Sequence, residues 1–444
     1  MKQLIRKIKE KTAIIGIIGL GYVGLPLALA FSKKFRVIGF DINEATVLNL
    51  TKGNSHITDI SDEYLKICLQ NNFYPSYKPN DLKSCDFIVI CVPTPLTAEK
   101  DPDLGHIKSS CKTIADIIRE GQFVILESTT YPGTTDEVVI PLLEGSGLKA
   151  GINFGVAYSP ERIDPGNQSF TVETVPKIIG GINKECSEIC AALYSEAVAS
   201  VIEVKDTKTA EAVKMLENIF RNVNIALVNE LALIFEKMDI DTWEVISAAS
   251  TKPYGFMPFY PGPGVGGHCI PLDPYYLSYK AQKYGFIPRF IDTAGEINDY
   301  MKMHVINLAA QGLKKCGKSL FEAQVTLLGL SYKKNIDDVR ESPSIKVIEE
   351  LTNLGAYVRL FDPYVQKIKT KNGDYTSENS IDESIRQSDC LIFMVDHDQF
   401  KEINLNEIVN TMRTPVIIDC KNIFEGSGDY LYLGLGKGFC VNEY

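Results

Sequence analysis

No apolar run in this 444-residue sequence approaches the roughly 18 to 20 residues that a membrane-spanning helix needs, because Gly, Pro or Lys interrupts the longest ones. The chain has no Cys-X-X-Cys pair, and its 11 cysteines are an odd number. It shows no basic patch of the kind that nucleic-acid binding requires, and its formal net charge is -10 at pH 7. These absences predict a cytoplasmic protein with reduced thiols that binds neither membranes nor nucleic acids.

The N-terminal segment has two interpretations. It begins with the basic stretch MKQLIRKIKEK, and the apolar stretch TAIIGIIGLGYVGLPLALAF follows, which is also the pattern of a secretory signal. The glycines of the second stretch have a more specific use in a nucleotide-binding turn. We therefore expect this segment to begin a folded domain.

Hydrophobic residues make up 45% of the chain and charged residues 23%, so it can bury sizeable cores, and its length favours two or three domains. In the first 205 residues, strand-like apolar runs alternate with helical patterns. Continuous apolar runs of this kind are typical of a parallel sheet that is covered on both faces. We expect a doubly wound α/β domain over residues 1–205, with strands at 13–18, 36–41, 85–91, 122–127 and 153–158.

The pattern then changes to helix. Residues 207–238 read as one long helix with apolar residues at helical spacing, and further helices are predicted at 241–249 and 295–315. We expect a helical middle domain over residues 206–316, and the apolar long helix predicts a homodimer.

The alternation restarts at about residue 322 and predicts a second α/β domain over residues 317–444. The expected fold is therefore α/β, with two Rossmann-like doubly wound parallel-sheet domains joined by a long central helix and the helical middle domain. The elements predicted in the last domain are a helix at 342–354 and strands at 323–330, 357–363, 390–396 and 415–420.

Gly19, Gly21 and Gly24 form a G-X-G-X-X-G motif between the first predicted strand and the next helix. These glycines suit a tight turn, a close approach to a pyrophosphate and helix–sheet packing, respectively. Asp41 ends the second strand 22 residues after Gly19, where a carboxylate binds a ribose hydroxyl and repels a 2′-phosphate. The motif therefore predicts an NAD site, with a glycine turn of purely structural use as the alternative.

Other predicted strand ends border the same crevice. Tyr22 and Val23 lie inside the glycine motif, Pro93 and Thr94 lie in CVPTP, and Thr129 lies in ESTTYPGTT. Because the carboxyl ends of parallel strands meet at one edge of a sheet, we expect all of these residues at the cofactor.

A second motif, GPGVGGHCIPLDPYYL at 262–277, places Cys269 in a loop that cannot be a regular strand or helix. Glycines such as Gly266 would let the backbone wrap closely around a substrate, and Cys269 would be a nucleophile. The alternatives are a buried cysteine that acts as a small hydrophobic residue and glycines that serve only the geometry of the turn. His268 would contact the ligand, support the loop or act as a base, and Asp273 is a carboxylate close to the thiol if the loop turns back.

Seven motifs in this order resemble the UDP-glucose/GDP-mannose dehydrogenase family across essentially the whole chain. They are GLGYVGLPLA, CVPTP, ESTT with PGTT, SPERIDPG at 159–166, the long helix with Lys214 and Asn218, GPGVGGHCIPLDP, and GLSYKKNIDDVRESPS at 329–344. SPERIDPG and HCIPLDP look most like the branch that oxidises UDP-N-acetylhexosamines, and the lengthened basic N-terminus looks like the enzymes for UDP-N-acetylglucosamine. UDP-N-acetylmannosamine and other UDP-sugars, UDP-glucose among them, remain open.

The resemblance implies a four-electron oxidation of the sugar C6 alcohol to a carboxylate, with two NAD molecules in succession. Cys269 would capture the aldehyde as a thiohemiacetal, which is oxidised to a thioester and then hydrolysed. The product would be a uronic acid for a surface polysaccharide or another glycan.

The resemblance also assigns catalytic roles. Lys214 and Asn218, four residues apart on one helix face, would stabilise oxyanions, although a solvated helix face is the alternative for Lys214. Glu161 would be the general base in hydrolysis, with Thr129 positioning the water, and Asp273 would assist proton transfer with Lys214.

Substrate contacts would come partly from the last domain. Lys333 looks like the family lysine that contacts the sugar-nucleotide, and Arg340 would be a basic contact nearby, unless it pairs with Asp337 or Asp338. Arg162 departs from the hydrophobic residue of the UDP-glucose enzymes, which bears on sugar specificity. No metal ion is expected, and the full set of expected substrate-binding residues is Glu161, Arg162, Lys214, Asn218, Gly266, His268, Lys333 and Arg340.

Two rival functions are compatible with parts of the sequence. One is a two-electron β-hydroxyacid dehydrogenase, which also has a Rossmann domain followed by a long helix but needs no thiol. The other is a nucleotide-sugar-binding regulator with an inactive site, against which the presence of Cys269, Lys214 and Glu161 argues. The number of NADH molecules formed per sugar distinguishes these functions.

Overall fold

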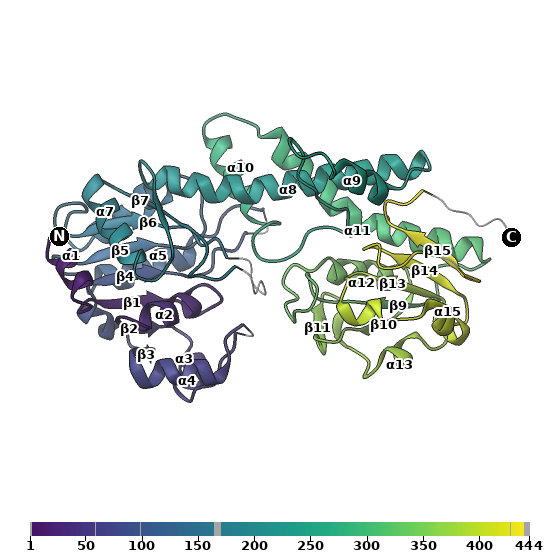
Figure 1. Ribbon diagram of the computed structural model, residues 1–444, viewed down its shortest axis with the longest axis horizontal. Coiled ribbons are helices and arrows are strands. Elements are labelled where there is room, and N and C mark those ends of the chain that lie inside the picture. The colour runs from purple at the N-terminus through teal and green to yellow at the C-terminus, as the bar shows by residue number, and fades with distance from the viewer. Residues whose placement is uncertain (1, 58, 98, 164–169, 427, 439–444) are drawn as a thin grey trace. The chain divides into compact units, whose positions relative to one another are not determined.

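The computed structural model describes residues 2–57, 59–97, 99–163, 170–426 and 428–438 (Figure 1). The chain forms two compact units. Unit 1 consists of Met1–Glu217 and Tyr275–Phe286, and unit 2 consists of Asn218–Pro274 and Ile287–Tyr444. The long helix predicted over 207–238 is present as α8 (Thr207–Lys237). It contributes residues to both units.

Unit 1 contains an eight-stranded sheet in the order β3-β2-β1-β4-β5-β6-β7-β8. All five strands predicted from the apolar runs are present as β1, β2, β4, β5 and β6, and they pair in parallel. Three further strands, β3, β7 and β8, were not predicted, and they include the one antiparallel pairing among the described strands of this sheet, between β7 and β6, with β8 parallel to β7. The strands are β1 (Ile14–Ile18), β2 (Arg36–Phe40), β3 (Phe73–Ser76), β4 (Phe87–Ile90), β5 (Phe123–Leu126), β6 (Gly155–Tyr158), β7 (Lys177–Gly181) and β8 (Val201–Glu203).

The helices of unit 1 begin with conventional signals. Asn43, Ser61 and Asn183 each accept a backbone N–H of the following helix through the side chain, which satisfies one of its unpaired donors. The helices are α1 (Lys2–Lys9), α2 (Gly24–Ser32), α3 (Glu44–Thr51), α4 (Asp62–Asn71), α5 (Gly105–Ala115), α6 (Ile140–Glu144) and α7 (Lys184–Tyr194), with a 3-10 helix at Pro79–Ser84 and a π-helix at Thr135–Val139.

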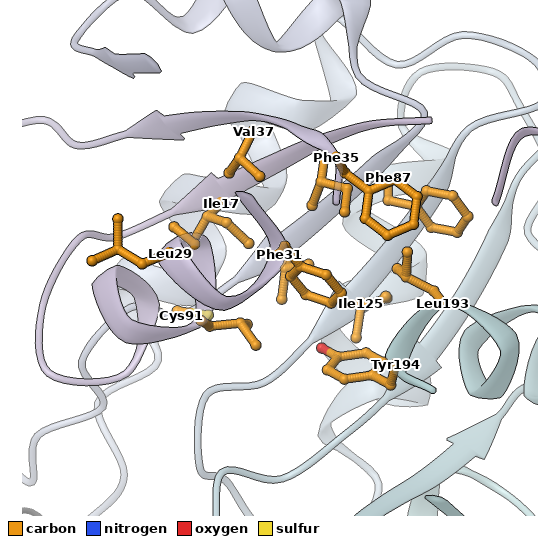
Figure 2. Close-up of a cluster of buried hydrophobic side chains, with 14 of the residues drawn as sticks. Ile17, Leu29, Phe31, Phe35, Val37, Phe87, Cys91, Ile125, Leu193 and Tyr194 are labelled. Atoms are coloured by element: carbon orange, nitrogen blue, oxygen red, sulfur yellow. The ribbon is translucent and has the colours of Figure 1, made fainter. Parts of the chain in front are cut away.

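The core of unit 1 joins α2, α7 and the sheet (Figure 2). Phe31 of α2 packs edge-to-face on Tyr194 of α7, with ring centroids 5.5 Å apart. The basic N-terminal segment forms α1, whose Leu4 and Ile8 are buried in the same core.

Unit 2 contains a five-stranded parallel sheet in the order β10-β9-β13-β14-β15. The four predicted strands are confirmed as β9, β10, β13 and β14, whereas β15 and the hairpin β11–β12 were not predicted. Helix α11 begins at residue 289, earlier than the predicted 295. The elements are β9 (Gln324–Leu328), β10 (Tyr357–Phe361), β11 (Lys367–Thr370), β12 (Gly373–Thr376), β13 (Cys390–Phe393), β14 (Val416–Asp419), β15 (Leu431–Gly434), α9 (Thr242–Ala249), α10 (Asp273–Lys283, mostly in unit 1), α11 (Arg289–Lys315), α12 (Pro343–Asn353), α13 (Ile381–Ile385), α14 (Asp398–Lys401), α15 (Leu405–Ile408) and a 3-10 helix at Val409–Thr411.

The two sheets share a hydrogen bond, from the loop after the first strand to an aspartate after the second, that the sequence did not reveal. In unit 1, Asp41 after β2 accepts the backbone N–H of Leu20, which follows β1. In unit 2, Asp362 after β10 accepts the backbone N–H of Leu330, which follows β9. In both units a glycine with positive φ directly follows the first strand, with φ of +91° at Gly19 and +97° at Gly329. Each sheet thus fixes the loop after its first strand with a carboxylate from the second.

Within the part of the chain that the structure describes, no helix has both the length and the apolar character required to cross a membrane.

Candidate active site

The G-X-G-X-X-G motif has the geometry of a dinucleotide-binding turn. A Cβ on Gly24 would lie 1.8 Å from the carbonyl oxygen of Gly19, so helix α2 can approach the turn only because Gly24 lacks a side chain. A Cβ on Gly21 would meet no atom within 4 Å. The absence of a side chain at Gly21 is therefore not required by the protein's own packing, and it leaves the backbone accessible to a pyrophosphate.

Asp41 is held by the backbone around it. Its Oδ2 accepts the N–H of Leu20 at 2.9 Å, and its Oδ1 accepts the N–H of Asn43 at 2.8 Å. A carboxylate has about four acceptor positions, so two remain for the hydroxyls of a ribose. The glycine turn and this carboxylate together fit NAD.

The other expected cofactor residues follow neighbouring strands. Tyr22 is 38% exposed and Val23 is half-buried in the glycine turn, whereas Pro93 is exposed after β4. Thr94 is buried, and its carbonyl accepts a hydrogen bond from the hydroxyl of Tyr276. Thr129 is half-buried after β5. The parallel register of β1, β4 and β5 brings these strand ends to one edge of the sheet.

Glu161, the expected general base, lies in a buried cluster at this edge. Its Oε1 accepts the backbone N–H groups of Arg162 and Ile163, both at 2.7 Å. Its Oε2 accepts a hydrogen bond from Nζ of Lys177 at 3.0 Å. Lys177 also pairs with Glu127, whose other oxygen accepts the hydroxyl of Tyr194 at 2.6 Å. The sequence did not point to Lys177, Glu127 or Tyr194.

The reversed strand β7 explains this cluster. Glycines 181 and 180 pair with Ala157 and Tyr158, so continuing the antiparallel register brings Lys177, the first residue of β7, opposite Glu161. If β7 were parallel to β6, its first residue would lie at the opposite end of the strands from Glu161. No strand was predicted over Lys177–Gly181, which is why Lys177 was missed.

Electrostatics separate the two acids. Burial raises the pKa of Glu127 to about 7, although Lys177 opposes this shift. Burial would also raise the pKa of Glu161, but the charge and hydrogen bond of Lys177, together with backbone N–H donors, bring it below its usual value. Burial alone would lower the pKa of Lys177, but the charges of Glu127 and Glu161 raise it. At neutral pH Glu161 is therefore an oriented carboxylate.

Two further expected residues, Arg162 and Lys214, belong to unit 1. Lys214 is only 5% exposed, so the alternative of a solvated helix face is wrong. Arg162 binds Glu217 through Nε at 2.9 Å and the carbonyl of Pro176 at 2.6 Å, which fixes its guanidinium. The end of the SPERIDPG motif, from residue 164 on, lies outside the described residues.

The glycine loop that carries Cys269 belongs to unit 2. A Cβ on Gly266 would lie 2.7 Å from the Cβ of Tyr332, and one on Gly267 would lie 2.9 Å from its ring. These two glycines therefore make room for a side chain of the protein itself, as the geometric alternative held, and the contact of Gly266 with a substrate stays a prediction. The contact ties the cysteine loop to the segment that contains Lys333.

Cys269 is half-buried where the loop turns into α10. Its carbonyl accepts the backbone N–H of Asp273 at 2.9 Å, so the loop turns back. This turn was the condition for a carboxylate at Asp273 close to the thiol. Oδ2 of Asp273 in turn accepts the side-chain amide of Asn218 at 2.5 Å. Both Asn218 and Asp273 are buried, at 1% and 3% exposure. The structure thus brings these two expected catalytic residues together beside the cysteine loop.

The remaining expected substrate residues also lie in unit 2. Arg340 binds Asp338 through Nε and a terminal nitrogen, so the ion pair considered for it is present. The carbonyl of Arg340 accepts the N–H of Gly267 at 3.0 Å. Burial, and then the charge of Arg340, lowers the pKa of the half-buried His268, so the imidazole is neutral at pH 7. Lys333 is half-buried, and its carbonyl accepts the hydroxyl of Ser331 at 2.7 Å.

Metal ligands are not grouped in the described residues: no three His, Cys, Asp or Glu side chains there are placed to hold an ion. The expected site residues are divided between the two units. Unit 1 holds the dinucleotide turn, Thr129, Glu161 and Lys214, and unit 2 holds Cys269, Asn218, Asp273, His268, Lys333 and Arg340.

A dinucleotide turn with an acidic ribose partner and a half-buried cysteine beside a buried carboxylate–amide pair are features of an NAD-dependent oxidoreductase. The chain belongs to the UDP-glucose/GDP-mannose dehydrogenase family. Its NAD binding domain matches residues 13–198, its central domain residues 208–300 and its UDP binding domain residues 326–426. The chain is therefore an enzyme, an NAD-dependent UDP-sugar dehydrogenase.

Similar proteins cover nearly the same length. Protein CapL of Staphylococcus aureus is 40% identical over 93% of this chain and 95% of its own. A UDP-N-acetyl-D-glucosamine 6-dehydrogenase of Pseudomonas aeruginosa is 38% identical over 89% of this chain and 93% of its own. The structure of a UDP-D-ManNAc dehydrogenase from Pyrococcus horikoshii aligns with a TM-score of 0.89 at 35% identity, over 96% of this chain and 99% of that one.

Proposed function

We propose that this enzyme oxidises the C6 alcohol of a UDP-N-acetylhexosamine to a carboxylate in a four-electron reaction, with UDP-N-acetylglucosamine as the first candidate. The similarity to the Pseudomonas aeruginosa enzyme supports that sugar. UDP-N-acetylmannosamine is the second candidate, since the similar structure from Pyrococcus horikoshii acts on that sugar. The uronic acid product would serve a surface polysaccharide or another glycan.

When bound, NAD supplies the hydride acceptor, and two molecules in succession take up the four electrons. The thiol of Cys269 bonds to the aldehyde carbon and so retains the two-electron product as a thiohemiacetal. After the second oxidation the same sulfur holds the acyl group as a thioester. The enzyme therefore has no need to release a reactive aldehyde.

The observation that carries this proposal is the buried pair of Asn218 and Asp273 beside the Cys269 loop. An amide donor and an aligned carboxylate next to a thiol suit a reaction in which a carbonyl oxygen gains and loses negative charge. Lys214, buried one helical turn before Asn218, supplies a positive charge for the same purpose. Asp273 assists proton transfer with Lys214.

Hydrolysis of the thioester requires a base for water. Glu161 suits this role because its carboxylate is oriented by two backbone N–H groups and by Lys177. Thr129 positions the water, and the neutral His268 contacts the sugar-nucleotide.

The three segments divide the work in this proposal. Residues 1–205 bind NAD, residues 206–316 carry the catalytic and dimer contacts, and residues 317–444 bind the UDP moiety. The three family domains, which cover 13–198, 208–300 and 326–426, support this division. Lys333 and Arg340 recognise the diphosphate or the sugar, with Arg162 and Gly266 near the substrate.

Oligomeric state and location complete the proposal. Phe220, Leu227 and Ile234 of α8 are 45%, 50% and 45% exposed, and an apolar stripe of this kind on a long helix suits a homodimer. Light scattering of Leu227→Glu together with Ile234→Glu should give a monomer where the unmodified protein gives a dimer. We place the enzyme in the cytoplasm, where the thiol that the reaction needs stays reduced.

The reaction is tested with the purified protein, NAD and a panel of UDP-hexoses and UDP-N-acetylhexosamines, followed by NADH absorbance and product mass. We expect two NADH molecules per sugar and a uronic acid. Cys269→Ala should abolish acid formation and leave NAD binding near normal. One NADH per sugar, or acid formation by the variant at the normal rate, would reject the covalent route.

A further inference from the structure

Glu161, the proposed base, is buried in unit 1 in a cluster with Lys177, Glu127 and Tyr194, and the last two have no role in the chemistry described so far. Lys177 is 4% exposed and Glu127 is 1% exposed. Charged side chains are rarely buried unless they are paired, and pairs of this kind seldom add stability over apolar residues of the same volume. The cluster therefore calls for a functional explanation.

One lysine serves two carboxylates in this cluster. Nζ of Lys177 contacts Oε2 of Glu161 at 3.0 Å and also pairs with Oε1 of Glu127. The second oxygen of Glu127 accepts the hydroxyl of Tyr194, and the second oxygen of Glu161 accepts two backbone N–H groups. All four carboxylate oxygens are thus hydrogen-bonded, which fixes both side chains.

The two acids differ in what surrounds them. Glu161 has an ammonium group and two backbone donors, whereas Glu127 has the same ammonium group and one phenol. Among the described residues, the other titratable groups that face Glu127 are Cys91 after β4 and Cys190 on α7, and burial raises the pKa of both thiols, so they stay neutral. Burial likewise raises the pKa of Tyr194. As the pH falls towards 7, the first proton therefore goes to Glu127, and Lys177 stays paired with Glu161.

We propose that Lys177 is a positioning residue that holds Glu161 as an ionised, oriented base, and that Glu127 is the acid of this cluster that takes up a proton in its place. This inference rests on the proposed function, in which Glu161 activates the hydrolytic water. In that step the water oxygen bonds to the acyl carbon while Glu161 takes a water proton. The carbon–sulfur bond then breaks and its electron pair leaves with the sulfur of Cys269 as thiolate. No oxidant or reductant takes part.

The test uses Glu127→Gln, Lys177→Arg and the double variant Glu127→Gln with Lys177→Met. The double variant removes the lysine without leaving Glu127 as a buried unpaired charge, so it tests positioning rather than folding. For each protein the pH profile of kcat, the NADH count and the intact mass of acid-quenched enzyme are measured with UDP-N-acetylglucosamine.

We expect the acid limb of the double variant's profile to move up by at least one pH unit, because Glu161 loses its cation. Hydrolysis should become the slow step, so quenched enzyme should carry the acyl group on Cys269. Lys177→Arg should restore the normal limb. Glu127→Gln alone should leave the limb in place or move it to lower pH, since Lys177 then serves Glu161 alone.

Lys7→Met is the matched control. Lys7 contacts the buried Asp86 at 2.6 Å, but Asp86 directly precedes β4 and so lies at the opposite edge of the same sheet. This variant should keep the normal profile and show no adduct.

The outcomes separate the two proposals. The role of Lys177 would be overturned by an unshifted acid limb in the double variant, or by an equal loss of kcat at every pH without an adduct. The proposed function would still stand in that case, provided that the unmodified enzyme forms two NADH per sugar. One NADH per sugar in the unmodified enzyme, with no thioester in any variant, would overturn the proposed function itself.

Discussion

Asn218 donates a hydrogen bond through its side-chain amide to Oδ2 of Asp273 at 2.5 Å, and both side chains are buried. Oδ1 of Asn218 accepts a second hydrogen bond, from Arg221 at 3.0 Å. The amide is therefore fixed in one orientation, with its NH₂ group towards the carboxylate. Asp273 is held in turn by helix α10, which it begins. A change at either residue should be felt at the cysteine loop, since Asp273 also donates its N–H to Cys269.

We predict that Asn218→Asp lowers kcat at least 100-fold and destabilises the protein by about 2 kcal/mol at pH 8, because it sets two buried carboxylates against each other. The repulsion raises the pKa of one carboxylate, so the destabilisation should be small near pH 4 and grow as the pH rises through that raised value. Urea unfolding at several pH values measures this. Asn224→Asp on the same helix, whose amide contacts the Phe220 carbonyl, is the control, and an equal pH-dependent loss there would contradict the prediction.

The glycine turn gives a second prediction, in which two alanine substitutions separate packing from binding. Gly21→Ala should fold normally, since the new methyl group meets no protein atom, but it should raise KM for NAD at least 10-fold by blocking the pyrophosphate. Gly24→Ala should instead lower the melting temperature, because its Cβ would meet the Gly19 carbonyl at 1.8 Å. Thermal unfolding and NAD kinetics of the two proteins test the pair. A normal KM in a well-folded Gly21→Ala variant would contradict the placement of the pyrophosphate.

A third prediction concerns Asp41, whose two backbone hydrogen bonds are repeated at Asp362 in unit 2. Oδ1 of Asp362 accepts the N–H of Tyr364, as Oδ1 of Asp41 accepts that of Asn43. Asp41→Asn removes the charge that repels a 2′-phosphate, so the ratio of kcat/KM for NADP to that for NAD should rise about 10-fold. Asp362→Asn should cost stability without changing that ratio. If both variants or neither changed it, Asp41 would be a loop-fixing residue only.

How well the sequence predicted each feature depends on how far apart in the chain the residues that determine it lie. The strands β1, β4 and β5 were predictable because each is a short apolar run that is buried along all or nearly all of its length, and Gly24 because its place is set by the turn beside it. Neither β7 nor its direction was predicted from the sequence, and Lys177 was missed for that reason. Glu127 and Lys177 are 50 residues apart, and only the register of an antiparallel strand brings them together. The packing of Gly266 against Tyr332 was missed because these two residues are also distant in the sequence.

The fourth prediction concerns pH and Glu211 of α8, which is fully buried. Its carboxylate accepts hydrogen bonds from the backbone and the hydroxyl of Thr135, at 2.8 and 2.7 Å, and from the backbone of Gly133. Burial nevertheless raises its pKa from 4.5 to about 7. The folded protein then holds a proton that the unfolded chain has released, so this residue's contribution to stability is complete below pH 4.5 and declines as the pH rises to about 7.

Compared with Glu211→Gln, which cannot titrate, the unmodified protein should therefore lose about 3 kcal/mol of unfolding free energy between pH 4.5 and 7. Comparing the two proteins cancels the contributions of the other acids, several of which act in the opposite direction. Denaturant unfolding at intervals of half a pH unit gives the two curves, and their difference should bend near pH 7. A flat difference curve for Glu211→Gln would mean that the three donors keep this carboxylate ionised despite its burial.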